Sequence, residues 1–173
     1  MKANRTRIIS ALVVIFLIII GFIYTSSTGV TPHEEFHVHA AFQQFIGDER
    51  QSYANEQFMH VEPCTLDDHH NDSAKTPDEK AHLHDLNGEV VHVHDETATW
   101  NDFFTGLGVT LPENAIGYIN GVEDNNFLDA PIENYDRLLI VDENTTDIDG
   151  KIYNLPSVED IRSVENASES CGN

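Results

Sequence analysis

The residues from Ala81 to His94 constrain the fold most, because polar and apolar side chains alternate on both sides of a turn. Two His-x-His pairs, His82/His84 and His92/His94, flank the turn sequence Asp-Leu-Asn-Gly-Glu. Successive side chains in a strand point to opposite faces, so each pair presents two imidazoles on one face, about 7 Å apart. The segment is therefore expected to form a β-hairpin with one histidine-bearing face.

Two registers are open to this hairpin. A two-residue Asn87-Gly88 loop sets His82 opposite Val93, which mixes histidine and aliphatic side chains on both faces. A three-residue loop with Gly88 in the left-handed bulge position pairs residues whose numbers sum to 174, so His82 faces His92. The other face then carries only the apolar residues Ala81, Leu83, Val91 and Val93. Register follows the hydrophobic pattern where one face is buried, so the three-residue loop is predicted.

A third pair, His37/His39, lies in an earlier segment, Phe36 to Ile46. Here Phe36, Val38, Ala40 and Phe42 alternate with the histidines and Ala41, which predicts a half-buried strand. Whether this strand joins the hairpin is left open by the sequence. One interpretation of all three pairs is a solvated strand face that becomes charged below about pH 6.

The other interpretation is a metal site. Imidazole is the commonest metal ligand among side chains, and opposed strand residues lie about 5 Å apart at Cβ. We expect His82, His84 and His92 to form the nucleus of a copper or zinc site, because imidazole suits Cu(II) and Zn(II). His94 and the pair His37 and His39 complete it if the earlier strand joins the same face. Asp85 and Asp95 are candidates for orienting the imidazoles.

The chain is expected to have four regions. Residues 1–24 are a membrane anchor, 25–35 a linker, 36–155 a histidine-rich α+β ectodomain, and 156–173 an acidic polar tail. Residues 8–24 are uncharged and span about 25 Å as a helix, near the short end for a bilayer. Lys2, Arg5 and Arg7 precede this run, which favours a cytoplasmic N-terminus and an extracytoplasmic domain. A cleaved signal peptide is the alternative, although no A-x-A-like site follows.

The charge of the exported part narrows its partners. Beyond residue 24 there are six basic and 30 acidic residues, a net charge of −24 with histidine neutral. Nucleic acid and anionic membrane surfaces are therefore poor partners, whereas cations are favoured. Cys64 and Cys171 both lie in this part, where a disulfide between them can persist. The alternative is that Cys64 is a metal ligand beside His60.

The C-terminal half predicts further elements. Thr97 or Thr99 can cap the start of a short helix, and Asp102, three residues after Thr99, resembles the partner in a capping box. Gly108 is typical of the end of this helix, and strands are expected over residues 116–119 and 137–141. A weaker strand is expected over residues 51–62. Hairpin, helix, strand, turn and strand, with Tyr118-Ile119-Asn120-Gly121 before the last strand, resemble the β-grasp (ubiquitin-like) arrangement of small sulfur carriers. Those carriers act through a terminal Gly-Gly, whereas this chain ends Cys-Gly-Asn, so their activity is not implied.

A longer resemblance covers roughly residues 36–141. The stretches FHVHAAF, HLHDLNGEVVHVH and DFFTGLG resemble those of a set of uncharacterised membrane-anchored extracytoplasmic proteins with paired His-x-His strands. This implies an exported, histidine-bearing domain and no particular activity.

The sequence therefore predicts a membrane-anchored extracytoplasmic protein that binds copper or zinc for acquisition, buffering or delivery. Two alternatives stay open. One is a small metalloenzyme that uses the same histidines, and the other is a cell-surface interaction module that binds an envelope protein without metal. Nucleophile-elbow, P-loop and dinucleotide-binding motifs are absent from the sequence.

Overall fold

The computed structural model describes residues 36–60 and 75–166. The predicted anchor, the linker and both cysteines lie outside these residues, as do His33, His69 and His70. Within the described ranges, no helix is both long enough and apolar enough to cross a bilayer.

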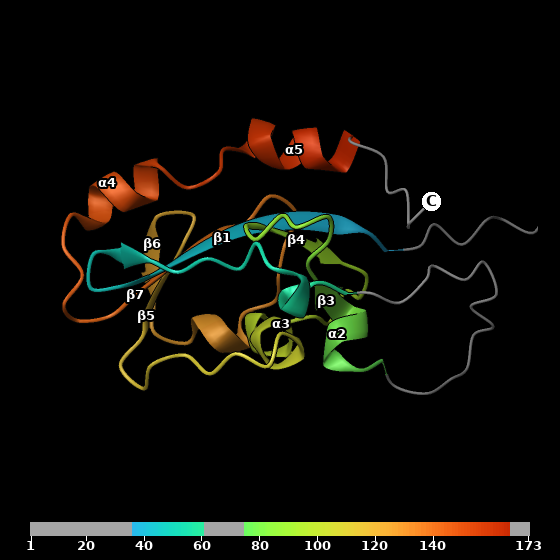
Figure 1. The fold of residues 1–173 in the computed structure, drawn as a ribbon, viewed down its shortest axis with the longest axis horizontal. Coiled ribbons are helices and arrows are strands. Elements are labelled where there is room, and N and C mark those ends of the chain that lie inside the picture. Colours follow the sequence, from blue (N-terminus) through green and yellow to red (C-terminus); the bar gives the residue numbers. More distant parts are fainter. Residues whose placement is uncertain (1–35, 61–74, 167–173) are drawn as a thin grey trace, which may run out of the picture. The chain divides into compact units, whose positions relative to one another are not determined.

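One seven-stranded sheet forms the centre of the described part (Figure 1). Its strands are β1 (Val38–Ile46), β2 (Glu49–Arg50), β3 (Ala81–His82), β4 (Val90–Val93), β5 (Ile116–Ile119), β6 (Val122–Asp124) and β7 (Arg137–Val141). The order is β3-β4-β1-β7-β5-β6, and β2 pairs with the end of β1. β1 is parallel to β7, and the other pairings among the described strands are antiparallel. The predicted α+β class with one mostly antiparallel sheet is confirmed.

The β3–β4 hairpin has the predicted register. His82 lies opposite His92, and Ala81 lies opposite Val93. The four residues expected on the apolar face are all buried in the main core, namely Ala81, Leu83, Val91 and Val93. The contrast between the two faces therefore selects the register, because a shift by one residue would bury the histidines in this core.

The loop of this hairpin differs from the prediction. The left-handed residues are Asp85 (φ 55°) and Leu86 (φ 59°), so the placement of Gly88 in a left-handed bulge is wrong. Gly88 has a different role, because a Cβ at this position would overlap the backbone of Tyr53 and Ala54. The close approach of a distant segment, rather than the turn itself, requires glycine here.

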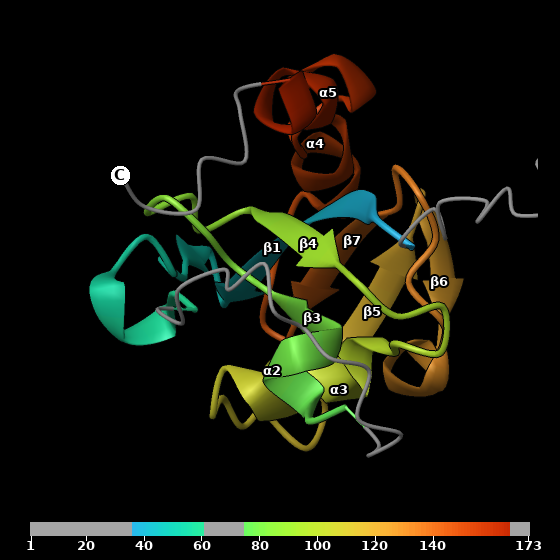
Figure 2. The same cartoon turned by 90° about the vertical axis from the view of Figure 1, so that its right-hand side faces the viewer.

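Helices cover both faces of the sheet (Figures 1 and 2). They are η1 (Glu56–Phe58), α2 (Pro77–Lys80), α3 (Trp100–Gly106), η2 (Phe127–Asp129), α4 (Ile148–Tyr153) and α5 (Val158–Asn166). The main core lies on the side of α2 and α3, where Trp100, Phe103 and Phe104 pack with apolar residues of β1, β4 and β7. α3 has the predicted capping box, and Gly108 follows it with φ 65°.

The predicted polar tail contains a packed helix. α5 occupies part of residues 156–173, and its Ile161 is fully buried against Ala41 and Val90 on the face opposite the main core. Val158, Ile161 and Val164 recur every three residues, so a narrow apolar stripe runs along an otherwise acidic helix. Three apolar residues in this polar segment are too few to predict the helix from the sequence.

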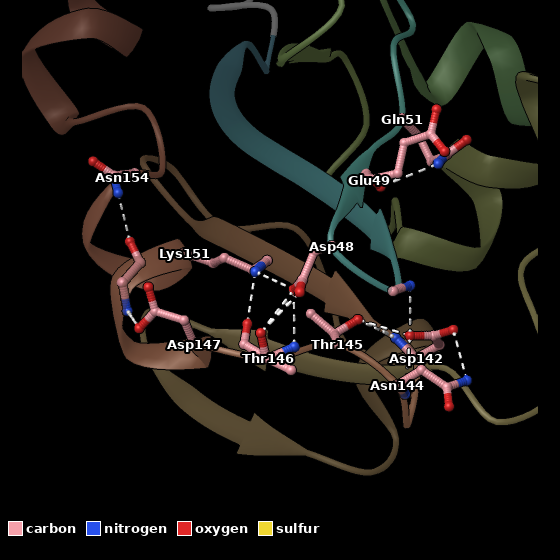
Figure 3. Close-up of polar contacts among 12 residues, drawn as sticks. Asp48, Glu49, Gln51, Asp142, Asn144, Thr145, Thr146, Asp147, Lys151 and Asn154 are labelled. Atoms are coloured by element: carbon pink, nitrogen blue, oxygen red, sulfur yellow. Dashed lines mark hydrogen bonds and ion pairs between the residues drawn. The ribbon is translucent and has the colours of Figure 1, made fainter.

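A polar network lies at the end of β1 that is far from its histidines (Figure 3). Asp48 accepts hydrogen bonds from the Lys151 ammonium (2.9 Å) and from the Thr146 N–H (3.0 Å). These bonds lower the pKa of Asp48 to about 2. Asp142 accepts a hydrogen bond from the Gly47 N–H (2.8 Å). The turn after β1 is thus joined to the segment between β7 and α4.

Candidate metal centre

All seven histidines of the described residues have ring contacts with one another. They lie at β3, β4 and the start of β1, which Figure 2 shows side by side, and in the segment that pairs with Leu83 after β3. The strand registers place His39 opposite His92 and His92 opposite His82, so three imidazoles form a row across three strands. The second member of each His-x-His pair lies two residues away on the same face. Farther along β1 and β4, α5 covers this face at Ala41 and Val90.

The first triad consists of His37, His39 and His92. One nitrogen from each imidazole lies within 4.8 Å of the others, and His39 Nε2 is 3.2 Å from His92 Nδ1. His39 and His92 are buried and His37 is half-buried. Both polar groups of the His39 backbone are hydrogen-bonded. The N–H donates to the Asn134 side chain (3.2 Å), and the carbonyl oxygen accepts from the Tyr135 N–H (2.7 Å).

The second triad consists of His82, His84 and His94, whose nitrogens also lie within 4.8 Å of one another. His82 Nε2 is 2.8 Å from His84 Nε2, and the His82 and His94 ring centroids are 5.0 Å apart. His82 Nδ1 lies 2.6 Å from the carbonyl oxygen of Asp78. A carbonyl oxygen only accepts, so Nδ1 carries the proton and Nε2 faces the triad with its lone pair.

The structure brings the six predicted histidines together, but in a different grouping from the predicted nucleus. His92 belongs with the β1 pair, and His94 takes its place beside His82 and His84. The reason is that β1 lies directly beside β4, a long-range pairing that the sequence left open. The rings of His84 and His92 are still only 4.7 Å apart, so the two triads adjoin.

His60 is a seventh member of this histidine face, which the sequence placed only beside Cys64 and not with the paired histidines. The predicted weak strand over residues 51–62 is reduced in its described part to η1 and one bridge, in which Met59 pairs with Leu83. This bridge brings the His60 ring to 4.4 Å from His82, in a stacked arrangement. His60 Nδ1 also lies 3.8 Å from a carboxylate oxygen of Asp78. The alternation at Phe58-Met59-His60 is the sequence pattern that places His60 on a strand face, but it is weaker than the three His-x-His pairs.

Asp85 and Asp95 are the carboxylates that were expected to orient the imidazoles. Asp85 is exposed in the hairpin loop, and Asp95 accepts hydrogen bonds from the N–H (2.8 Å) and hydroxyl (2.6 Å) of Thr97. Asp78 contacts the histidines instead, through its carbonyl oxygen on His82 and its carboxylate beside His60. Its position in α2, directly before β3, is set by the capping box of Thr76 and Glu79.

Burial lowers the pKa of three histidines well below the ordinary value. The pKa falls to about 4 for His82, about 3 for His94 and about 2 for His92. Neighbouring imidazoles act in the same direction, because a charge on one ring disfavours a proton on the next. For His82 the hydrogen bond to the Asp78 carbonyl partly offsets the effect of burial. At neutral pH these imidazoles are therefore uncharged, which is the form that binds metal ions.

Within each triad, the distances between imidazole nitrogens fit the ligands of one metal ion. A tetrahedral ion with metal–nitrogen bonds of about 2.0–2.1 Å separates its ligands by roughly 3.3 Å. The 3.2 Å between His39 Nε2 and His92 Nδ1 is close to this value. The 2.8 Å between His82 and His84 is shorter and also fits a hydrogen bond from one ring to the other. Each triad offers three ligands and leaves a fourth position for water or another ligand.

Comparison with protein-family models, with curated proteins and with solved structures finds no match for this chain. The resemblance to membrane-anchored proteins with paired His-x-His strands therefore stays a prediction.

Proposed function

We propose that this chain is a membrane-anchored extracytoplasmic protein that binds copper or zinc, for acquisition, buffering or delivery. The observation that supports it most is the convergence of six histidines, from three neighbouring strands and the residues that flank them, into two groups of three with ligand atoms in reach of one another. Such convergence requires a strand register that places every His-x-His pair on one face.

The burial of the histidines favours this proposal over a solvated strand face. His39, His82 and His92 are only 2%, 7% and 5% exposed. A solvated face would leave these rings in water, where they could take up protons freely. Burying polar rings has a free-energy cost unless they are partnered, and aliphatic residues would pack in these positions at lower cost. The presence of histidine at these buried positions is explained if the rings bind a metal ion.

The ligand set indicates the class of metal. Both triads consist of imidazoles without a carboxylate or thiolate, which suits Cu(II) and Zn(II) and disfavours Mg²⁺ and Ca²⁺. Between the two favoured ions, intrinsic affinity favours copper. The acidic surroundings, with a net charge of −24 beyond residue 24, attract either cation.

The finer features of fold and location belong to the same proposal. The order β4-β1-β7-β5-β6, with β1 parallel to β7 and α3 between β4 and β5, supports a β-grasp-like arrangement to which β3 adds an edge strand. In this arrangement β1, rather than a strand of the 81–94 hairpin, is the central partner of the last strand. The apolar run over residues 8–24 supports the membrane anchor, with the histidine face on the extracytoplasmic side.

A small metalloenzyme is the second candidate. One observation favours it, namely that three protein ligands per triad leave an open coordination position for water or substrate. It predicts that the metal-loaded protein hydrolyses or oxidises small test substrates and that chelation abolishes turnover.

The proposal is tested by retained metal. The full chain, purified in detergent without affinity-tag histidines and stripped with a chelator, is exposed to Zn²⁺ or Cu²⁺, desalted and subjected to elemental analysis. We expect tightly held metal in the native sequence and its loss in the combined variant His39→Gln, His82→Gln and His92→Gln. His60→Gln is the matched control, because it removes a histidine of the same face outside both triads. Equal metal in the combined variant, or none in the native sequence, would refute the proposal.

A further inference from the structure

We propose that the histidine face holds two metal ions at once, one in each triad, as a coupled dinuclear site. The inference rests on the proposed metal binding and specifies its stoichiometry and geometry. It comes from one juxtaposition: the His92/His94 pair is divided, so that His92 completes the His37/His39 group and His94 completes the His82/His84 group.

The number of ligands exceeds what one ion uses. A tetrahedral ion takes four ligands, and an ion with an open position takes three. Six imidazoles in two groups of three therefore match two ions. Each triad draws two ligands from one His-x-His pair and one from the His92/His94 pair in and directly after β4, and the two triads have no side chain in common.

The two groups are as close to each other as their own members are. Across the triads, the ring centroids of His37 and His94 are 4.5 Å apart, and those of His84 and His92 are 4.7 Å apart. Within a triad, the rings of His37 and His39 are 4.6 Å apart. Ions bound in both triads would therefore be close neighbours, as the ions of two-metal sites are.

This closeness has an electrostatic consequence. Neutral imidazoles bring no charge to offset two divalent ions, and the Coulomb repulsion of two doubly charged ions is four times that of two singly charged ones. The second ion therefore binds more weakly than the first, even where a shared anion offsets part of the repulsion. Among the described residues no side chain is common to the two triads, so a ligand that bridges their open positions would be a small oxygen donor from solvent, such as hydroxide formed when a bound water releases a proton to solvent.

Monovalent ions provide a direct contrast. Two Ag⁺ ions repel each other four times less than two Zn²⁺ ions at the same separation. We therefore expect the affinities for the first and second ion to differ at least tenfold for Zn²⁺ and by a smaller factor for Ag⁺.

The experiment measures metal stoichiometry in the full chain in detergent, with His33, His69 and His70 changed to Gln so that only the described histidines remain. Zn²⁺ and Ag⁺ are titrated and counted by native mass spectrometry, and Cu²⁺-loaded protein is measured by electron paramagnetic resonance. We expect two ions per chain, with a Cu²⁺ signal that integrates to well under the total copper because the two ions are coupled.

Variants assign the ions to the triads. His37→Gln with His39→Gln and, separately, His82→Gln with His84→Gln should each leave one ion per chain and restore the full uncoupled Cu²⁺ signal. His60→Gln is the control and should keep two coupled ions. The single variants His37→Gln and His84→Gln, which change half-buried rings, serve if a double variant does not fold.

The outcomes separate this inference from the proposed function. One ion per chain that either pair variant abolishes would overturn the dinuclear site and leave metal binding intact. Two ions that are magnetically independent, or a second ion that persists in both pair variants, would also overturn it. Absence of any bound ion in the native sequence would overturn both.

Discussion

Acidification is expected to destabilise the metal-free protein through its buried histidines. In the unfolded chain, His82, His92 and His94 take up protons near pH 6.5, whereas in the folded chain their pKa values are about 4, 2 and 3. Below pH 6.5 the unfolded state therefore binds more protons, so the free energy of unfolding falls as the pH falls. Stability from this source is fully present above pH 6.5 and is lost progressively down to the folded pKa values.

The magnitude follows from the width of this window. At pH 5 each of the three histidines is almost fully protonated only in the unfolded chain, which lowers the free energy of unfolding by about 2 kcal/mol per histidine. The sum is about 6 kcal/mol, or about 4 kcal/mol after allowance for the partial exposure of His94 and for coupling between the rings. Small domains have about 5–15 kcal/mol in total. The metal-free protein is therefore expected to be close to unfolding at pH 5.

Urea unfolding followed by circular dichroism, in chelator, measures this effect between pH 7 and pH 4.5. Three protons correspond to a slope of about 4 kcal/mol per pH unit near pH 5. The variant with His82, His92 and His94 all changed to Gln should lack that slope, while it keeps the titration of all carboxylates. If the native sequence and this variant lose stability in parallel, the three histidines are not held neutral and the reasoning fails.

Two predictions concern packing. Gly88→Ala should lower the free energy of unfolding by about 1–3 kcal/mol, because its Cβ would overlap the backbone of Tyr53 and Ala54. Urea unfolding compares this variant with Gly108→Ala, in which only the left-handed φ is strained. A smaller loss at Gly88 than at Gly108 would contradict the close approach of the Tyr53–Ala54 backbone to Gly88. Ile161→Ala should lower the free energy of unfolding by about 2–4 kcal/mol, because Ile161 of α5 is fully buried against the sheet. Val122→Ala, at a side chain 70% exposed, should change stability little, and equal effects would mean that α5 does not pack on the sheet.

The hairpin register could be predicted because it depends on local alternation. One register separates histidines from aliphatic residues and the other mixes them, so burial of one face decides between them. The conformation of the loop could not be predicted in the same way. Gly88 is needed because residues 53–54 pass over it, and the sequence of the turn carries no information about that approach.

The grouping of the ligands depends on contacts between distant segments. The insertion of β1 between β4 and β7 decides that His92 meets His39, and the three strands are far apart in sequence. His60 joins the face through one bridge between Met59 and Leu83. The predicted strands β5 and β7 and the capped helix α3 are correct because their apolar runs and caps are local signals. α5 was not predicted, because its few apolar residues are enough to pack the helix on the sheet but too few to identify a helix in the sequence.

Metal binding should reverse the acid sensitivity, which links the stability of this protein to its proposed ligand. The buried imidazoles are costly to the metal-free fold, and an ion that binds only the folded state stabilises it by about 4 kcal/mol at a free concentration 1,000-fold above its dissociation constant. This gain is similar to the loss expected at pH 5. Saturating Zn²⁺ should therefore raise the midpoint of urea unfolding strongly at pH 7 and shift the acid transition to lower pH, until protons displace the metal. The variant with His39, His82 and His92 changed to Gln should show neither shift. Equal stabilisation of that variant would mean that Zn²⁺ acts through the acidic surface, and the histidine face would then be a structural feature rather than a metal site.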